Sequence, residues 1–403
     1  MKKNELFLIT VLFFISGCSS PKNTNEALHQ SLFTMDSHID TPIRLSFPGF
    51  DIRKSYNWSE YATSVDLSRL RKGGLDAGFW AIYSRQGPLT TEGYDVSYIN
   101  AKRRLAQIQN MVKSNPDSLV LAKSTQEINR LSGDSRHIIV LSMENAYPLG
   151  NDLTKLNEFY KKGLRMLGLV HVTNNQFADS STDKKGEKWG GLSPLGKELV
   201  KRANDLGIIL DGSHASDKAV LQLIELSRAP IVLSHSGVKS IFEHPRNVDD
   251  NLLRELAQKG GVIQMNAYPS YLRKIVYSKD RLEARRTFFD KMYAMEDNNQ
   301  PISFQEFSSI LKEIDKQYPP QDAYFQDYMN HFDHALKIIG PYHVGVGADW
   351  DGGGGAKGMR DVSMIPKITD YLATAGWGEK DLQQIWGANL LRVMRKVETL
   401  SDR

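Results

Sequence analysis

The chain has 403 residues, of which 40% are hydrophobic and 24% are charged. This is an ordinary globular composition, and the chain is long enough to bury a large core, which argues against a disordered protein. The formal net charge is only +4 and the basic residues form no run, so no nucleic-acid partner is expected. The single cysteine excludes any disulfide within the chain, and any homodimer is expected to be noncovalent.

The first residues have the composition of an export signal. Two lysines precede a mostly apolar stretch, residues 6–15, and small residues lead to Cys18. The apolar stretch is about half of the roughly 20 residues needed to span a bilayer, which favours a cleaved signal over a permanent membrane helix. Residues 15–18 also resemble a bacterial lipobox, in which the cysteine becomes the lipidated N-terminus. An ordinary signal peptide with an incidental cysteine is the alternative.

We therefore expect a lipoprotein signal peptide at residues 1–17, lipidation of Cys18 and a flexible tether at residues 18–31. The lipid would anchor the protein to a bacterial membrane in the cell envelope. The rest of the chain would lie on the membrane surface, facing the periplasm or the exterior.

From residue 32 to near the C-terminus, short β-rich runs alternate with helical stretches, which is the pattern of a parallel sheet built from βα units. Most runs are apolar throughout, as expected for strands covered on both faces. The expected strands comprise residues 32–40, 77–83, 137–144, 164–169, 208–211, 231–235, 262–266 and 343–347. This number of units predicts a (β/α)8 TIM barrel in the α/β class, formed by residues 32–403.

The stretches between these strands carry apolar residues at helical spacing. Helices are expected at residues 100–112, 194–206, 217–227 and 251–258. The charged region at residues 271–339 does not fit a minimal barrel. Its pattern predicts helices at residues 271–295 and 304–316, and we interpret the region as a helical insertion that covers the active site.

Reactive side chains follow nearly every expected strand. The first strand ends with His38 and Asp40, which are two residues apart and therefore point to the same side. Glu144, His214, His235 and Asp349 follow later strands. A lone histidine at such a position is more often a hydrogen-bonded polar residue than a ligand. Their coincidence at the catalytic end of successive strands instead favours a shared site for divalent zinc, which accepts imidazole and carboxylate ligands.

These residues lie in segments that resemble the membrane dipeptidase family, also called renal dipeptidase or peptidase family M19, among the metal-dependent amidohydrolase-like barrels. The similarity runs from about residue 36 to residue 392. The matching segments are Asp36-Ser37-His38-Ile39-Asp40, Met143-Glu144-Asn145, Asp211-Gly212-Ser213-His214, Ser234-His235-Ser236 and Gly347-Ala348-Asp349-Trp350-Asp351-Gly352.

The resemblance implies a dipeptidase that hydrolyses an amide bond with a hydroxide bridging two Zn²⁺ ions. His38 and Asp40 would hold one ion, His214 and His235 the other, and Glu144 would bridge them. The family pattern further implies that Asp349 transfers protons and that His171 contacts the scissile carbonyl. Arg246 and Tyr268 would bind the substrate's terminal carboxylate.

Other functions remain open at this stage. The same fold supports lactonases and other amidohydrolases, and relatives differ in whether they accept a C-terminal D-residue or open β-lactam rings. A non-catalytic surface lipoprotein that keeps the fold is a further alternative. The presence of all five expected metal ligands and of Asp349 argues against that alternative.

Overall fold

The computed structural model describes residues 24–61 and 63–401. Parallel strands form a ring in the order β2-β1-β10-β9-β7-β6-β5-β4, and the pairing of β2 with β4 closes it. The barrel strands are β1 (Met35–Ile39), β2 (Ala77–Tyr83), β4 (His137–Glu144), β5 (Leu164–Gly168), β6 (Ile209–Asp211), β7 (Val232–Val238), β9 (Val262–Met265) and β10 (Val344–Val346). The predicted (β/α)8 barrel is confirmed.

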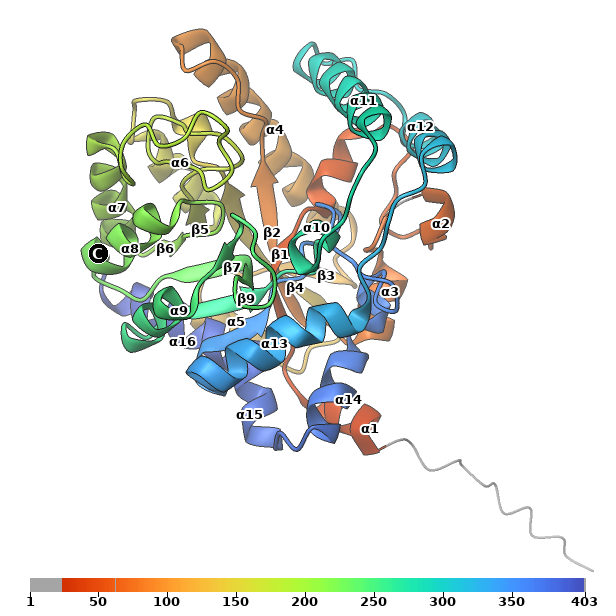
Figure 1. The fold of residues 1–403 in the computed structure, drawn as a ribbon, viewed down its shortest axis with the longest axis vertical. Coiled ribbons are helices and arrows are strands. Elements are labelled where there is room, and N and C mark those ends of the chain that lie inside the picture. The colour runs from red at the N-terminus through yellow and green to blue at the C-terminus, as the bar shows by residue number, and fades with distance from the viewer. Residues whose placement is uncertain (1–23, 62, 402–403) are drawn as a thin grey trace, which may run out of the picture.

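Helices surround the ring of strands (Figure 1). The helices that follow successive strands are α3 (Leu67–Gly73), α4 (Thr91–Ser114), α6 (Lys155–Lys162), α7 (Pro194–Leu206), α8 (Asp217–Leu226), α9 (Asp250–Gln258), α13 (Phe325–Ile339) and α14 (Pro366–Thr374). The additional elements are α1 (Thr24–Ser31), α2 (Trp58–Tyr61), β3 (Leu119–Leu121), α5 (Thr125–Leu131), β8 (Asn247–Val248), α10 (Pro269–Leu272), α11 (Lys279–Asp297), α12 (Phe304–Gln317), α15 (Glu379–Gln383) and α16 (Asn389–Thr399).

The barrel interior is apolar at the amino-terminal ends of the strands and polar at the carboxyl ends. Ile138 and Val140 of β4 pack in one apolar cluster with Phe79 of β2. Residues at even spacing on a strand share a face, so the side chain of Glu144, at the end of β4, also points inward. Helix α16 packs against the same apolar cluster through Val393 and Met394. The interior is therefore packed at one end and offers polar groups at the other.

The amino-terminal part of the described chain is more ordered than expected. Residues 24–31 form helix α1, which packs on α14. His29 is buried and its ring nitrogens contact Thr369 Oγ1 at 2.6 Å and Gly73 O at 2.8 Å. The expectation of a tether at residues 18–31 is therefore wrong for residues 24–31. The expected signal peptide and Cys18 lie outside the described residues. Within the described chain, no helix has the length and apolar character needed to cross a bilayer.

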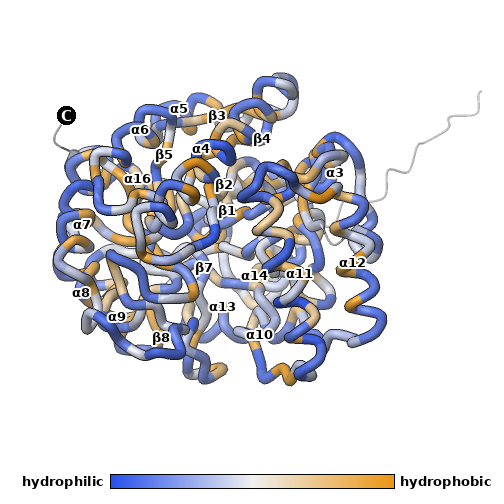
Figure 2. The backbone as a smooth tube through the Cα atoms, turned by 90° about the horizontal axis from the view of Figure 1, so that it is seen from above, coloured by the Kyte–Doolittle hydropathy of each residue, from blue (hydrophilic) through white to orange (hydrophobic). Residues whose placement is uncertain are grey.

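The region expected to be an insertion divides into two parts. Helix α13 belongs to the barrel, because Tyr328, Phe332 and Leu336 join the main core that includes Val344 of β10. Only the preceding segment, with α10, α11 and α12, is additional to the barrel. Helices α11 and α12 lie together at one side of the molecule (Figure 1). Viewed from above, α12 alternates hydrophilic and hydrophobic segments (Figure 2), as expected for a helix with one buried face.

Helix α11 begins at Lys279 and not at residue 271 as the apolar pattern indicated. The side chain of Ser278 accepts a hydrogen bond from the backbone N–H of Arg281 and thereby caps the helix. Helix α4 likewise begins earlier than expected, at Thr91, because Thr90 accepts a bond from Gly93 N–H. In both cases the capping residue sets the boundary.

His137 connects β2 to the start of β4, and we expect it to make the fold sensitive to acid. Its Nε2 accepts a hydrogen bond from Trp80 Nε1 at 3.0 Å, and its Nδ1 donates to Leu75 O at 2.8 Å. Burial lowers the pKa of His137 to about 4, and the bond to Leu75 opposes this shift only in part. An unfolded histidine has a pKa of roughly 6.5, so this contribution to stability is complete above that pH and is lost as the pH falls towards 4.

Through His137 alone, the free energy of unfolding is lower by about 3 kcal/mol at pH 4 than above pH 6.5. In the variant His137→Gln, the free energy of unfolding should be lower at pH 7 but should fall less between pH 7 and pH 4 than in the unmodified protein. Chemical denaturation at a series of pH values measures this difference. An unchanged pH dependence in the variant would contradict the assignment.

Candidate active site

The residues predicted to bind metal come together at the carboxyl ends of the strands. His38 is in β1, Asp40 follows it, and Glu144 is the last residue of β4. His214 follows β6 and His235 lies within β7. All five side chains are buried. Segments separated by as many as about 200 residues in the sequence therefore supply one compact group of imidazoles and carboxylates.

Glu144 lies at the centre of the group. One carboxylate oxygen, Oε2, is 3.5 Å from His38 Nε2. The other, Oε1, is 3.0 Å from His214 Nε2 and 3.6 Å from His235 Nε2. Asp40 Oδ2 is 3.4 Å from His38 Nε2, on the side of Oε2. The two oxygens of Glu144 thus face two different sets of side chains, as a carboxylate that bridges two ions must.

Irregular strand pairing turns two of the histidines inward. Met35 and Val232 lie in the interior apolar cluster, so strict alternation along β1 and β7 would place His38 and His235 on the outer face. The register between β1 and β2 shifts between Asp36 and Ile39, and the register between β7 and β9 shifts between Leu233 and Ser236. These irregularities direct both imidazoles into the barrel mouth.

Three polar residues of the site adopt left-handed backbone conformations. The φ angles are 68° for His214, 64° for Asp349 and 71° for Asn145. Such angles are uncommon outside glycine and are least costly for asparagine and aspartate. Each lies in a turn after a strand, where the chain changes direction and presents a side chain to the mouth. Backbone strain of this kind tends to accumulate at functional sites.

The group has an excess of negative charge. Burial raises the pKa of Asp349 well above its usual value, and the carboxylates of Asp40 and Glu144 add to this effect. The pKa of Asp40 is raised for the same reasons, first by burial and then by Glu144. Carboxylic acids that share a buried site resist ionisation unless positive charge is supplied. Divalent cations would supply that charge.

The histidines divide into two electrostatic types. Burial opposes protonation of His38, but the carboxylates of Asp40 and Glu144 outweigh it and raise the pKa well above its usual value. Burial, together with the charge of Arg246, lowers the pKa of His214 and of His235 well below the usual value. The latter two rings are therefore neutral at pH 7, as metal ligands must be.

The hydrogen bonds around His235 place its ring proton on Nδ1, and Nε2 faces His214 Nε2 at 2.7 Å. Ser234 Oγ donates its only proton to Asp211 Oδ2 at 2.5 Å, so the 2.7 Å contact between Ser234 Oγ and His235 Nδ1 must be donated by the ring. The proton of neutral His235 is thus on Nδ1, and Nε2 presents a lone pair to the site. Outer partners that fix a ring in this way are typical of histidine ligands.

Other features of the site also fit metal ions. Both ring nitrogens of His38 and Oδ1 of Asp40 are buried without a hydrogen-bond partner. A side chain at Gly352 would place its Cβ 2.1 Å from both Asp40 Oδ2 and Asp349 Oδ1, so glycine keeps the space between these carboxylates open. Among the residues that the structure describes, three groups of side chains have ligand atoms within 4.8 Å of one another: His38, Glu144 and His235; Glu144, His171 and His214; and His38, Asp40 and Asp349.

The three residues predicted to contact substrate surround this group. His171 Nε2 is 3.6 Å from Glu144 Oε1. Arg246 is 3% exposed and donates to His235 O at 2.9 Å, but no carboxylate of the described chain pairs with it. A buried guanidinium without an anionic partner is costly, which favours a role in binding an anion. Tyr268 is half-buried, and its ring stacks on Tyr271 at 4.4 Å.

Several neighbours with supporting roles were not predicted. Tyr83, the last residue of β2, packs edge-on against His171 at 5.2 Å. Tyr271 lies under the guanidinium of Arg246, 5.3 Å from ring centre to carbon. Asn266 donates to His235 O at 3.2 Å and to Asp349 Oδ2 at 3.5 Å. The rule that strand ends face the site could have identified Tyr83 and Asn266, whereas nothing in the sequence marks Tyr271.

Asp351, in contrast, faces away from the metal ligands. Its carboxylate accepts hydrogen bonds from Thr41 Oγ1 at 2.6 Å and from Ser64 N–H at 2.6 Å, and it lies 4.0 Å from Arg44 Nη2. It therefore fixes the loop after β10 to the segment after β1. This loop carries Asp349 and Gly352, so Asp351 positions the site without belonging to the ligand group.

Comparisons with known proteins agree with this geometry. A family model described as membrane dipeptidase (peptidase family M19) matches residues 22–403. Dipeptidase 3 of Rattus norvegicus is 28% identical over 382 residues, which cover 94% of this chain and 67% of that protein. Dipeptidase tcpJ of Claviceps purpurea is 26% identical over 347 residues, which cover 85% of this chain and 71% of that protein.

Solved structures show the same relationship. The probable dipeptidase PvdM from Pseudomonas aeruginosa matches with a TM-score of 0.78 and 33% identity, over 94% of this chain and 98% of that one. A metallo peptidase from Rhodobacter sphaeroides, liganded with a phosphinate mimic of the dipeptide L-Ala-D-Ala, shares the fold with a TM-score of 0.69 and 22% identity, over 91% of this chain and 99% of that one. The chain therefore belongs to the membrane dipeptidase family, peptidase family M19, and is a metal-dependent dipeptidase.

Proposed function

We propose that the protein hydrolyses the amide bond of dipeptides with two zinc ions, held by His38, Asp40, Glu144, His214 and His235. The observation that supports this most strongly is the position of Glu144, whose two oxygens face His38 on one side and His214 with His235 on the other. Zinc ions at such a site lower the pKa of a water molecule to roughly 7 and polarise a carbonyl group.

Asp349 is the residue that we assign to proton transfer. Its carboxylate lies within 4.8 Å of ligand atoms of His38 and Asp40, and Asn266 orients it. Ionised Asp349 would accept a proton from the attacking water and then donate it to the amine that leaves. The same group thereby serves as base and then as acid.

His171 would stabilise the negative charge that develops on the carbonyl oxygen. The side chain is 22% exposed, so it borders both the buried ligands and the open mouth. Tyr83 packs against the ring and limits its movement. A preorganised donor at this position is commonly worth about a hundredfold in rate.

Arg246 and Tyr268 would hold the free carboxylate of the dipeptide. Because a longer peptide has no free carboxylate next to the cleaved bond, this contact would select dipeptides. In the variant Arg246→Ala, we expect KM for dipeptides to rise about tenfold or more, with a smaller change in kcat, since a charge-assisted bond to the substrate is lost. Steady-state kinetics measure this effect, and an unchanged KM would show that the carboxylate binds elsewhere.

A substrate panel tests the proposed reaction. The zinc-loaded protein should hydrolyse L,L-dipeptides, and the panel should include dipeptides with a C-terminal D-residue, tripeptides, a β-lactam and lactones. Hydrolysis of dipeptides but not of tripeptides is the expected result. Hydrolysis of lactones with no turnover of any dipeptide would contradict the proposal.

We further propose that Cys18 is lipidated and anchors the protein to a bacterial membrane in the cell envelope. The support is the sequence of residues 6–18, in which an apolar stretch and small residues precede the cysteine. In cell fractionation, the unmodified protein should accompany the membrane and Cys18→Ser should not. Equal distribution of both would contradict the anchor.

A further inference from the structure

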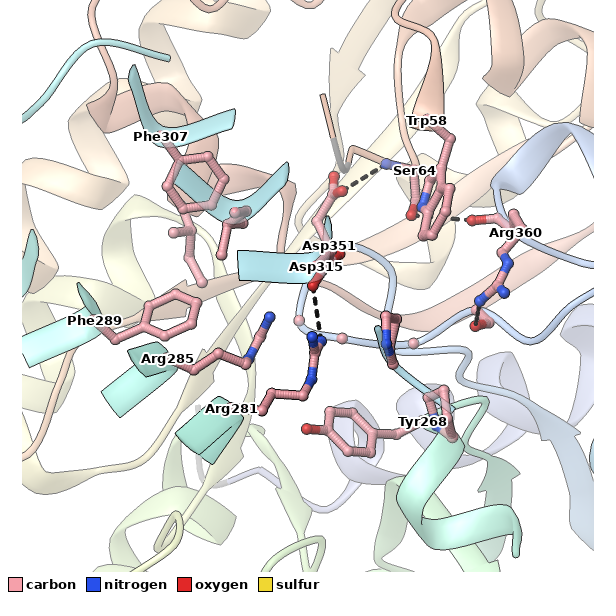
Figure 3. A pocket seen from close by; sticks show the side chains of 18 of the residues that line it. Trp58, Ser64, Tyr268, Arg281, Arg285, Phe289, Phe307, Asp315, Asp351 and Arg360 are labelled. Atoms are coloured by element: carbon pink, nitrogen blue, oxygen red, sulfur yellow. Dashed lines mark hydrogen bonds and ion pairs between the residues drawn. The ribbon is translucent and has the colours of Figure 1, made fainter. Parts of the chain in front are cut away.

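A cavity of about 320 Å³ lies beside the metal ligands, between the barrel mouth and the helices α11 and α12. Tyr268 and the loop residues Gly352 and Gly353 form the side next to the active site. Arg281, Arg285 and Phe289 of α11 form another part of the lining (Figure 3). The volume is at the lower end of the range of small-molecule sites, roughly 300 to 1,000 Å³, and is sufficient for one substrate side chain.

The charged groups of this cavity are paired, with one exception. Arg281 lies 2.8 Å from Asp315, and Arg360 lies 2.5 Å from Asp322. Asp351, the remaining carboxylate of the lining, is occupied by the hydroxyl, amide and arginine contacts described above. Every aspartate of the lining therefore already has partners.

Arg285 is the exception. Within the described part of the chain, no carboxylate lies within ion-pair distance of it, and its guanidinium carbon lies 5.2 Å from the centre of the Phe289 ring. Arg285 extends from α11 towards the cavity beside Arg281 (Figure 3). The cavity therefore presents a half-buried cation that lacks a counter-ion.

The cavity that contains Arg285 lies next to the place proposed for the substrate's terminal carboxylate. Tyr268, which we assign to the substrate's terminal carboxylate, is part of the lining. Burial raises the pKa of Tyr268, and the charge of Arg285 acts on the same phenol in the opposite direction, so the two groups are electrostatic neighbours. A residue whose main-chain carboxylate contacts Tyr268 would have its side chain next to this cavity. Phe289, Met292 and Tyr293 offer apolar surface for the methylene groups of such a side chain.

We propose that this cavity receives the side chain of the substrate's C-terminal residue and that Arg285 pairs with a carboxylate on it, so that dipeptides ending in aspartate or glutamate are preferred. The inference rests on the proposed dipeptidase function and names the substrate class. An arginine fork binds a carboxylate through two parallel hydrogen bonds, which neutral amide side chains cannot match.

The test compares Ala-Glu with Ala-Gln, which differ by one charge at nearly equal size. The zinc-loaded protein should hydrolyse Ala-Glu with a kcat/KM about tenfold higher, mainly through a lower KM, because the pair is only half-buried. Arg285→Gln should remove this preference while leaving hydrolysis of Ala-Gln within about twofold. Arg285→Lys should keep part of the preference, since it retains the charge but not the fork.

Arg286→Gln is the matched control, because Arg286 is an exposed neighbour on the same helix and does not line the cavity. It should retain the full preference. Equal kcat/KM for Ala-Glu and Ala-Gln in the unmodified protein would overturn the inference while leaving the dipeptidase function intact. A preference confined to Glu-Ala over Gln-Ala would overturn the assignment of the cavity to the C-terminal side chain. Failure to hydrolyse any of these dipeptides would instead contradict the proposed function itself.

Discussion

Replacing Glu144 with glutamine is expected to remove most of the bound metal and to reduce kcat/KM for dipeptides by about a thousandfold or more, because metal ions contribute several kcal/mol to stabilising the transition state. Glutamine has the shape of glutamate but only one oxygen. Its amide nitrogen would face either His38 or the pair His214 and His235, and it cannot bind a cation there. The metal content of the purified variant and its steady-state kinetics measure both effects.

The fold of this variant should persist, because Glu144 repels Asp40 and Asp349 and its neutralisation relieves that repulsion. Glu255→Gln is a matched control, since it makes the same chemical change at an exposed position of α9. The control should keep its metal and its activity. Normal zinc content and normal turnover in Glu144→Gln would show that this carboxylate does not bridge the ions.

The variant Asp349→Asn should keep its metal and its fold but lose about a hundredfold to ten-thousandfold in kcat, which is the range for a lost general acid and base. Asparagine tolerates the left-handed backbone that this position requires, with φ at 64°. It also preserves the shape that packs beside Gly352 and Asn266. The change therefore removes proton transfer with little disturbance of structure.

Three measurements distinguish this outcome from general damage. Zinc content and the thermal unfolding midpoint of Asp349→Asn should match those of the unmodified protein, and KM should change less than kcat. A variant that retained its kcat would remove Asp349 from proton transfer. A variant that lost its zinc would make Asp349 a metal ligand instead.

Much of the barrel could be predicted from local sequence. The strands at residues 77–83 and 137–144 were predicted to the residue, because each is a continuous apolar run with a clear boundary. Helix α7 was predicted as accurately, since Ser193 caps its start and Gly207 ends it in a left-handed conformation. The candidate metal ligands and Asp349 could be identified because parallel strands place their carboxyl ends at one face. His171, Arg246 and Tyr268 were named only through the family resemblance.

The remaining features depend on contacts that no local pattern records. The register shifts that turn His38 and His235 inward arise from pairing with neighbouring strands. The sequence predicted β7 too short, because the last residues of this strand pair with β8. The same pairing keeps Arg246, the residue before β8, close to His235. The barrel helix α13 was assigned to the insertion because its charged face resembles the helices before it, and only its packing on β10 distinguishes it.

Titration of the metal-depleted protein with Zn²⁺, followed by calorimetry and by dipeptide hydrolysis in the same samples, tests most directly whether these five ligands form a two-ion centre. We predict that two zinc ions bind per chain and that hydrolysis reaches its maximum only when both are present. Full activity at one ion per chain, or the absence of zinc binding by a correctly folded chain, would contradict this account.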